Sequence, residues 1–247
     1  MNLEKYPMKP NGMYVLKKSD FDDIAEMILK EYMPAVLYRP QAVDIEYLAE
    51  ECFYLDIKYD CIQPDGKVLG MIAFADTKYP TYDYDGNDRC IELEEGTLLV
   101  DMSLIGSKNH TRRRFTLAHE IAHWACQRSY HSPQNQLYDF RRQPGLVACR
   151  TENIEQYRMR SLYGKHSDEF WLEWQADRLG AALLMPKKTF KEVCASVFWS
   201  HGIRNGYLSK DVGQRVAHEI ISTVAGMFDV SFRAAQIRMI NLDLIKV

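Results

Sequence analysis

The sequence lacks the features that mark membrane-bound, secreted or strongly nucleic-acid-binding proteins. No apolar run approaches membrane-spanning length, and no basic-then-apolar leader opens the chain. The six cysteines are dispersed and form no Cys-x-x-Cys pair, which is typical of reduced, mostly buried thiols. The net charge of −3 provides no general attraction to nucleic acid. We therefore expect a cytoplasmic protein that contacts no membrane and does not bind nucleic acid directly.

The most informative segment is residues 114–124, RFTLAHEIAHW, which contains a His-Glu-x-x-His motif in an expected helix. His119 and His123 are four residues apart, so both imidazoles leave the same helix face and can share one ion. Glu120 is rotated by roughly 100° from His119. It therefore borders the ion without binding it, where the general base for a metal-activated water must stand. The pattern predicts a zinc-dependent hydrolase, and most simply a peptidase.

A second segment can supply the third protein ligand that a catalytic zinc requires. Residues 167–186, SDEFWLEWQADRLGAALLMP, are expected to form a helix that begins after Ser167 and ends at the proline. Glu173 and Asp177 are four residues apart and point the same way. Glu173 is the predicted ligand, and Asp177 is predicted to accept the remaining N–H of a ligand histidine. Gly180 continues this face, so two helix backbones could approach closely there.

Together these segments resemble the ImmA/IrrE-type metallopeptidases, bacterial and phage proteins related to thermolysin-like zinc peptidases. The resemblance is carried by FTLAHEIAH at 115–123 and by EWQAD and LLMP within 173–186. It extends more weakly to residues 42–50 and 228–235. The long segment 127–166 between the two motifs departs from the family pattern and puts the shape of any cleft in doubt.

The resemblance implies a zincin-like core in which Zn²⁺ is held by His119, His123 and Glu173. It assigns the role of general base to Glu120. It also implies a protein substrate, namely a transcriptional repressor or similar regulator, as in the regulation of phages and mobile elements. The expected activity is therefore that of a zinc metallopeptidase.

The remaining pattern predicts an α+β fold, in which a small twisted antiparallel or mixed sheet packs on helices. Residues 79–88 are expected to form a loop. By resemblance, residues 96–102 are a candidate edge strand for pairing with substrate, and an ordinary core strand is the equal alternative. We expect a catalytic domain over 1–207 and a C-terminal helical pair over 208–247, packed on the same domain. The elements expected from periodicity are helices at 19–32, 40–52, 212–228 and 232–241, the last capped by Ser231, and strands at 56–62, 68–75 and 96–102.

The C-terminal helical pair supports an alternative function. A short turn at 229–231 separates the helices, so a DNA-binding or regulatory protein with a non-catalytic metal site is the main alternative. Against it, the second helix exposes only Arg233 and Arg238 as obvious contacts for phosphate or bases. A helical hairpin packed on the catalytic core is the favoured interpretation.

Two features of the predicted site stay open. Cys126 follows His123 by three positions and shares its face, so it is an alternative zinc ligand, although a buried core thiol is the favoured interpretation. A peptidase also needs a donor for the developing oxyanion. No spacing rule chooses among the candidates, which are Tyr130, His131, Tyr163, His166, His201 and His218.

Overall fold

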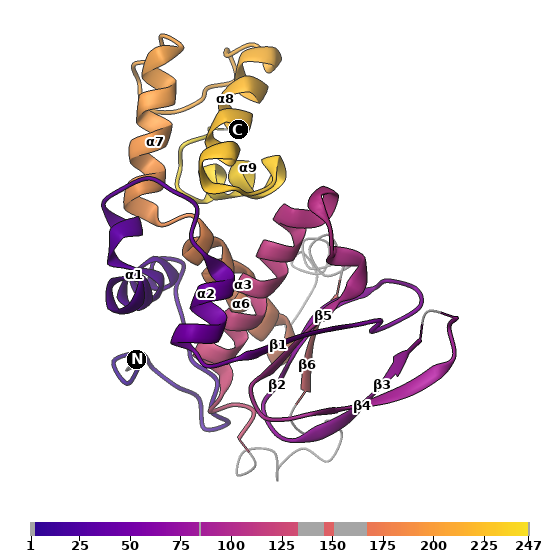
Figure 1. Ribbon diagram of the computed structural model, residues 1–247. Coiled ribbons are helices and arrows are strands. Elements are labelled where there is room, and N and C mark those ends of the chain that lie inside the picture. Colours follow the sequence, from indigo (N-terminus) through magenta and orange to yellow (C-terminus); the bar gives the residue numbers. More distant parts are fainter. Residues whose placement is uncertain (1–2, 84, 133–145, 151–166, 247) are drawn as a thin grey trace. The chain divides into compact units, whose positions relative to one another are not determined.

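The protein has an α+β fold, as predicted, with helices and two small sheets (Figure 1). The computed structural model describes residues 3–83, 85–132, 146–150 and 167–246. Among these residues, no helix is both long enough and apolar enough to cross a membrane.

The chain divides into two compact units. Unit 1 comprises Met1–Phe21 and Ile45–Gly180, and unit 2 comprises Asp22–Asp44 and Ala181–Val247. Each unit is therefore built from two separate stretches of sequence. The expected domains, 1–207 and 208–247, stay a prediction.

A mixed four-stranded sheet with the order β1-β5-β2-β6 forms the centre of unit 1. Strand β5 runs parallel to β1 and antiparallel to β2, and β2 is antiparallel to β6. Since β5 has a neighbour on each side, the interpretation of residues 96–102 as a substrate-pairing edge is wrong, and the equal alternative of an ordinary core strand is confirmed. All of β5 is buried, which explains its continuous apolar run. The strands are β1 Asp56–Asp60, β2 Val68–Ala73, β5 Thr97–Asp101 and β6 Leu146–Arg150.

A separate hairpin is formed by β3 (Thr77–Tyr82) and β4 (Asp88–Leu93). The loop expected at 79–88 is therefore wrong in part, because residues 79–82 and residue 88 belong to the two strands. Pro80 is tolerated because β3 pairs with a single strand at this position, so its missing N–H breaks no ladder in the sheet interior. The turn is closed by Asp83, whose carboxylate accepts the backbone N–H of Asn87 at 2.8 Å.

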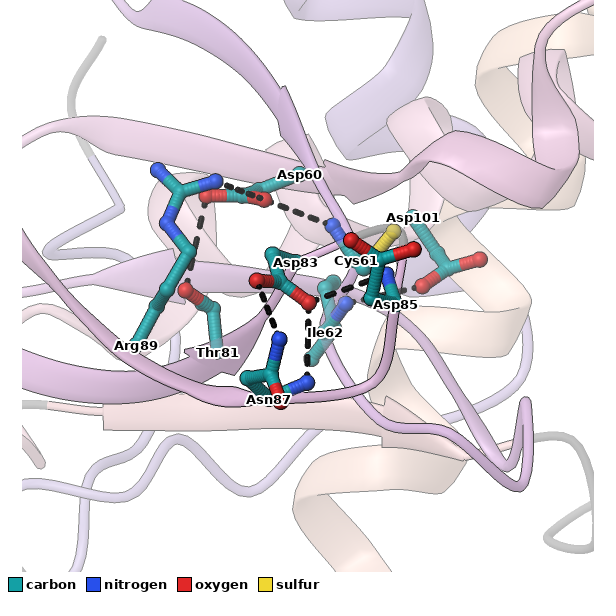
Figure 2. Close-up of polar contacts among 9 residues, drawn as sticks. All are labelled: Asp60, Cys61, Ile62, Thr81, Asp83, Asp85, Asn87, Arg89 and Asp101. Atoms are coloured by element: carbon teal, nitrogen blue, oxygen red, sulfur yellow. Dashed lines mark hydrogen bonds and ion pairs between the residues drawn. The ribbon is translucent and has the colours of Figure 1, made fainter.

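Asp60 connects the hairpin to the sheet (Figure 2). Its carboxylate accepts a hydrogen bond from the Thr81 hydroxyl at 3.5 Å and lies 3.7 Å from the guanidinium of Arg89. Its register partner Asp101 accepts the backbone N–H of Ile62 at 3.0 Å. These two buried carboxylates at the ends of parallel strands are thus matched by local donors. They join the strand ends to the hairpin and to the segment that follows β1.

The apolar core of unit 1 occupies both faces of the sheet. Met71 and Leu99 pack with Leu93 of the hairpin. Helix α3 (His110–Gln127) packs against β2 and β5. Because successive residues of a strand face opposite sides, Gly70 faces α3 where Met71 faces the hairpin.

The remaining helices confirm most of the periodicity predictions. Helices α1, α8 and α9 occupy the segments expected to be helical, and the Ser231 hydroxyl caps α9 by accepting the N–H of Ala234 at 3.1 Å. The helix expected over 40–52 begins five residues late, at Ile45, and consists of the short helix α2 followed by the π-helix η2. Helix α7 was not expected. The bounds are α1 Asp20–Tyr32, η1 Pro34–Leu37, α2 Ile45–Tyr47, η2 Leu48–Cys52, α6 Asp168–Leu184, α7 Lys187–Ser200, α8 Gln214–Phe228 and α9 Phe232–Asn241.

Arg238 is buried within unit 2, so the expectation that it is exposed on the last helix is wrong. Its guanidinium lies 2.5 Å from the carboxylate of Asp22 on α1 and donates to the carbonyl of Met185 at 3.0 Å. Only 6% of the residue is exposed. Of the two expected nucleic-acid contacts, Arg233 alone is at the surface, where it donates to Gln236. Only one of the two arginines that could have contacted phosphate or bases is therefore available on the last helix.

Candidate metal centre

Helix α3 carries three of the predicted site residues and is buried along most of its length. Leu117 and Ile121 are fully buried and belong to the apolar face of the helix. His119, Glu120 and His123 are buried as well, with at most 2% of each residue exposed. Ionisable groups at this depth must be matched by other polar groups or by an ion.

Helix α6 supplies Glu173 and Asp177. The Ser167 hydroxyl accepts a backbone N–H of the first turn at 3.3 Å, so the predicted N-cap is confirmed. Gly180 allows the helix to approach α3, because a Cβ at this position would lie 3.2 Å from the backbone of Ala118. The close approach expected at Gly180 is confirmed.

The two helices bring His119, His123 and Glu173 together. One potential ligand atom from each residue lies within 4.8 Å of the other two. The two Nε2 atoms are 2.9 Å apart. Glu173 Oε2 lies 3.3 Å from Nε2 of His119, and its Oε1 lies 3.6 Å from Nε2 of His123. This buried group of two imidazoles and a carboxylate could hold a metal ion.

Hydrogen bonds on the far side of each ring determine which nitrogen carries the proton. Nδ1 of His119 lies 3.0 Å from Oδ1 of Asp177, and an ionised carboxylate can only accept. Nδ1 of His123 lies 2.6 Å from Oε1 of Gln127, whose Nε2 donates to the carbonyl of Leu172 at 2.8 Å. Both rings therefore carry a proton at Nδ1, so that in the neutral form of each ring the lone pair is at Nε2, on the side of Glu173.

Gln127 is the site residue that the motif reasoning missed. It follows His123 by four positions, which is the same spacing that pairs Glu173 with Asp177. That spacing was therefore available as a signal. A glutamine is uncharged, however, and it belongs to no ligand motif.

Glu120 lies on the side of α3 that faces strand β2. A Cβ at Gly70 would lie 2.5 Å from Cγ2 of Thr116 and 3.4 Å from Oε1 of Glu120. The strand can pass this close to α3 because residue 70 is a glycine: a Cβ there would clash with Thr116, whereas it would be in ordinary contact with Glu120. This close approach is a second feature that the sequence did not reveal. Glu120 is adjacent to His119 in the helix but is not among the three residues whose ligand atoms converge.

Burial controls the protonation of two further groups on α3. Removal of the His123 ring from water lowers its pKa from 6.5 to about 4, although the charge of Glu173 opposes this shift. The ring is therefore neutral at physiological pH, which is the form that binds metal ions. Burial also raises the pKa of the Cys126 thiol to about 12. A protonated, buried Cys126 agrees with the favoured interpretation of a core thiol.

The described residues do not identify an oxyanion donor. Tyr163 and His166 lie outside the described part of the chain. Tyr130 packs in a buried cluster with Met13 and Leu172. The remaining candidates are engaged elsewhere: His131 stacks on Phe74, His201 lies near Glu219, and His218 stacks on Phe232.

Comparison with known proteins gives no family assignment. No protein-family model matches the chain, and no curated protein matches it. The resemblance to ImmA/IrrE-type metallopeptidases therefore stays a hypothesis, and the geometry of the site has to support any function on its own.

Proposed function

We propose that this protein is a zinc-dependent endopeptidase. His119, His123 and Glu173 hold the metal, Glu120 is the general base, and Asp177 orients the ring of His119. The observation that carries this proposal is the convergence of two Nε2 lone pairs and one carboxylate in a buried space.

The donor set fits a divalent cation. When both rings are neutral and protonated at Nδ1, neither Nε2 can donate to the other across the 2.9 Å that separates them. Two lone pairs and a carboxylate at this distance repel one another unless a positive charge lies between them. Two imidazole nitrogens and one carboxylate oxygen are a known ligand set of catalytic zinc, which keeps its fourth position for water or substrate.

The chemistry follows from the residues around the ion. Bound zinc supplies a Lewis acid that lowers the pKa of water and polarises a peptide carbonyl. The carboxylate of Glu120 accepts a proton from the attacking water and returns it to the leaving nitrogen. Asp177 and Gln127 keep Nδ1 of each ring protonated, so that Nε2 faces the metal.

The proposed substrate is a regulatory protein such as a transcriptional repressor. This part of the proposal is supported by the resemblance of the two motif segments to ImmA/IrrE-type metallopeptidases, with their zincin-like core. The burial of Arg238 weakens the DNA-binding alternative, so we do not carry it further.

Separating metal binding from cleavage tests the proposal. Glu120→Gln should retain zinc after dialysis, measured by elemental analysis, but lose cleavage by about 10² to 10⁴-fold because the proton acceptor is gone. His123→Ala should lose both. Cleavage is followed by co-expression with regulators encoded beside the gene and by mass-spectrometric mapping of new termini.

Glu192→Gln, an exposed position on α7, is the matched control and should change neither zinc content nor cleavage. If the Glu120→Gln protein cleaves at the wild-type rate, Glu120 is not the base. If the wild-type protein binds no zinc, the proposed metal centre is wrong.

A further inference from the structure

We propose that Gln127 is a positioning residue of the metal centre. Its amide holds the ring of His123 in the Nδ1–H form and ties that ring to the backbone of α6 one residue before Glu173. This inference rests on the proposed zinc site, and it adds a role that neither the motif nor the resemblance assigns.

The orientation of the Gln127 amide follows from its two partners. The residue is 1% exposed, so both ends of its amide need partners within the protein. The carbonyl of Leu172 can only accept, so the atom 2.8 Å from it must be the NH₂ group. The amide oxygen therefore faces Nδ1 of His123 at 2.6 Å, and the ring must donate to it. The lone pair of the ring is left at Nε2, on the side of Glu173.

The contact also joins the two helices of the site. Gln127 belongs to α3, and Leu172 directly precedes Glu173 on α6. The Gln127 side chain thus links the His123 ring on α3 to the backbone of α6 next to Glu173, the proposed third ligand. If the amide is lost, both the ring and the approach of α6 lose a restraint.

Gln127 and Asp177 make the two ligand histidines unequal. His119 donates to a carboxylate, whereas His123 donates to a neutral amide. An anionic partner makes an imidazole a stronger ligand than a neutral partner does. Replacing the amide by a carboxylate at the same position should therefore preserve ligation even though the bond to Leu172 is lost.

The test uses the full-length protein in zinc-loaded and metal-free forms. Zinc affinity is measured by competition with a chromophoric chelator. Ring protonation is read from long-range proton–nitrogen correlation spectra of the metal-free protein. Gln127→Met, which keeps the shape but not the polar atoms, should lower zinc affinity by about 10- to 100-fold and move the His123 proton partly to Nε2. Gln127→Glu should bind zinc more tightly than Gln127→Met.

Two variants complete the comparison. Gln175→Met removes a second buried glutamine, on α6, whose amide donates to the backbone carbonyl of Tyr14 at 2.8 Å. This variant should leave zinc affinity and ring protonation unchanged. Asp177→Ala should lower zinc affinity to a similar degree as Gln127→Met. The inference is overturned if Gln127→Met binds zinc like wild type, if the Met and Glu variants bind it equally, or if Gln175→Met weakens binding as much. If the wild-type protein binds zinc and Gln127→Met binds it with the same affinity, the role of Gln127 is rejected but the proposed peptidase is not.

Discussion

Single side chains of the candidate metal centre owe their protonation states to burial and to their hydrogen-bond partners. His123 is fully buried, and this burial disfavours its protonated form more than Glu173 favours it. A ring kept neutral in the folded protein is ready to bind metal, but it makes the fold sensitive to acid.

The metal-free protein should lose stability as the pH falls from about 6.5 to about 4. The unfolded chain protonates His123 near its ordinary pKa of 6.5, whereas the folded protein resists protonation until about pH 4. Acid therefore favours unfolding across this window, by roughly 2 kcal/mol for this residue between pH 7.5 and 5. Denaturant unfolding of wild type and His123→Gln at both pH values measures this contribution. If the stability of His123→Gln falls as steeply with decreasing pH as that of wild type, protonation of His123 is not the cause.

At this scale the sequence was informative wherever helical spacing determines which residues meet. His119 and His123 share one face of α3, and Glu173 and Asp177 share one face of α6, because each pair is spaced by four residues. The same rule could have found Gln127, but a neutral amide carries no ligand signal. The proximity of Gly70 to Glu120 could not be found in this way, because it depends on the packing of a strand against a helix that lies far along the chain.

Helices and strands of unit 1 are positioned by contacts that local patterns do not encode. The interior position of β5 follows from pairings with β1 and β2, which come from different parts of the sequence. The hairpin at β3 and β4 was hidden by a turn-rich, tyrosine-rich composition that resembles a loop. The helices of unit 1 could be predicted from the sequence pattern. The order in which its strands pair could not, because it depends on contacts between distant segments.

The contact between α3 and α6 should be intolerant of any side chain at Gly180. In Gly180→Ala the added methyl would meet rigid backbone atoms of Ala118 and His119 at 3.2 Å, so the helices must separate. We expect a loss of about 1 to 3 kcal/mol in the free energy of unfolding, together with weaker zinc binding. Chemical denaturation and chelator competition measure the two effects.

Gly226→Ala on α8 is the matched control. A Cβ there meets no atom within 4 Å, so alanine should be neutral or should stabilise the helix by up to about 1 kcal/mol. Equal destabilisation by the two substitutions would show that close packing at Gly180 is not the cause.

For the molecule as a whole, the division into two units means that stability is distributed between two cores. In unit 2 the buried pair of Asp22 and Arg238 joins the first and last helices, and Phe190 packs on Phe228 with ring centres 5.2 Å apart. The sequence placed the first and last helices correctly, whereas α7, which carries Phe190, was not expected. It also could not reveal that Arg238 of the last helix is buried. That orientation is determined by a carboxylate 216 positions away.

Arg238→Met should destabilise unit 2 by about 3 kcal/mol, because the carboxylate of Asp22 and the carbonyl of Met185 lose a buried donor. Lys187, 3.5 Å from Asp22, remains to offset part of the loss. Hydrogen exchange of the amides of α8 and α9 measures the change locally. Arg233→Met, at an exposed position of the same helix, should change exchange little. Similar effects of both variants would argue against a special role for the buried pair.

The discontinuous construction of unit 2 has a consequence for biosynthesis. The segments of unit 1 have all left the ribosome once residue 180 has emerged, whereas α1 must wait for residue 238 before its partner exists. At ordinary elongation rates this interval lasts roughly 3 to 12 s. During that time Asp22 of α1 lacks its native partner Arg238. The unit that carries the candidate metal ligands is therefore free to fold before unit 2 is complete.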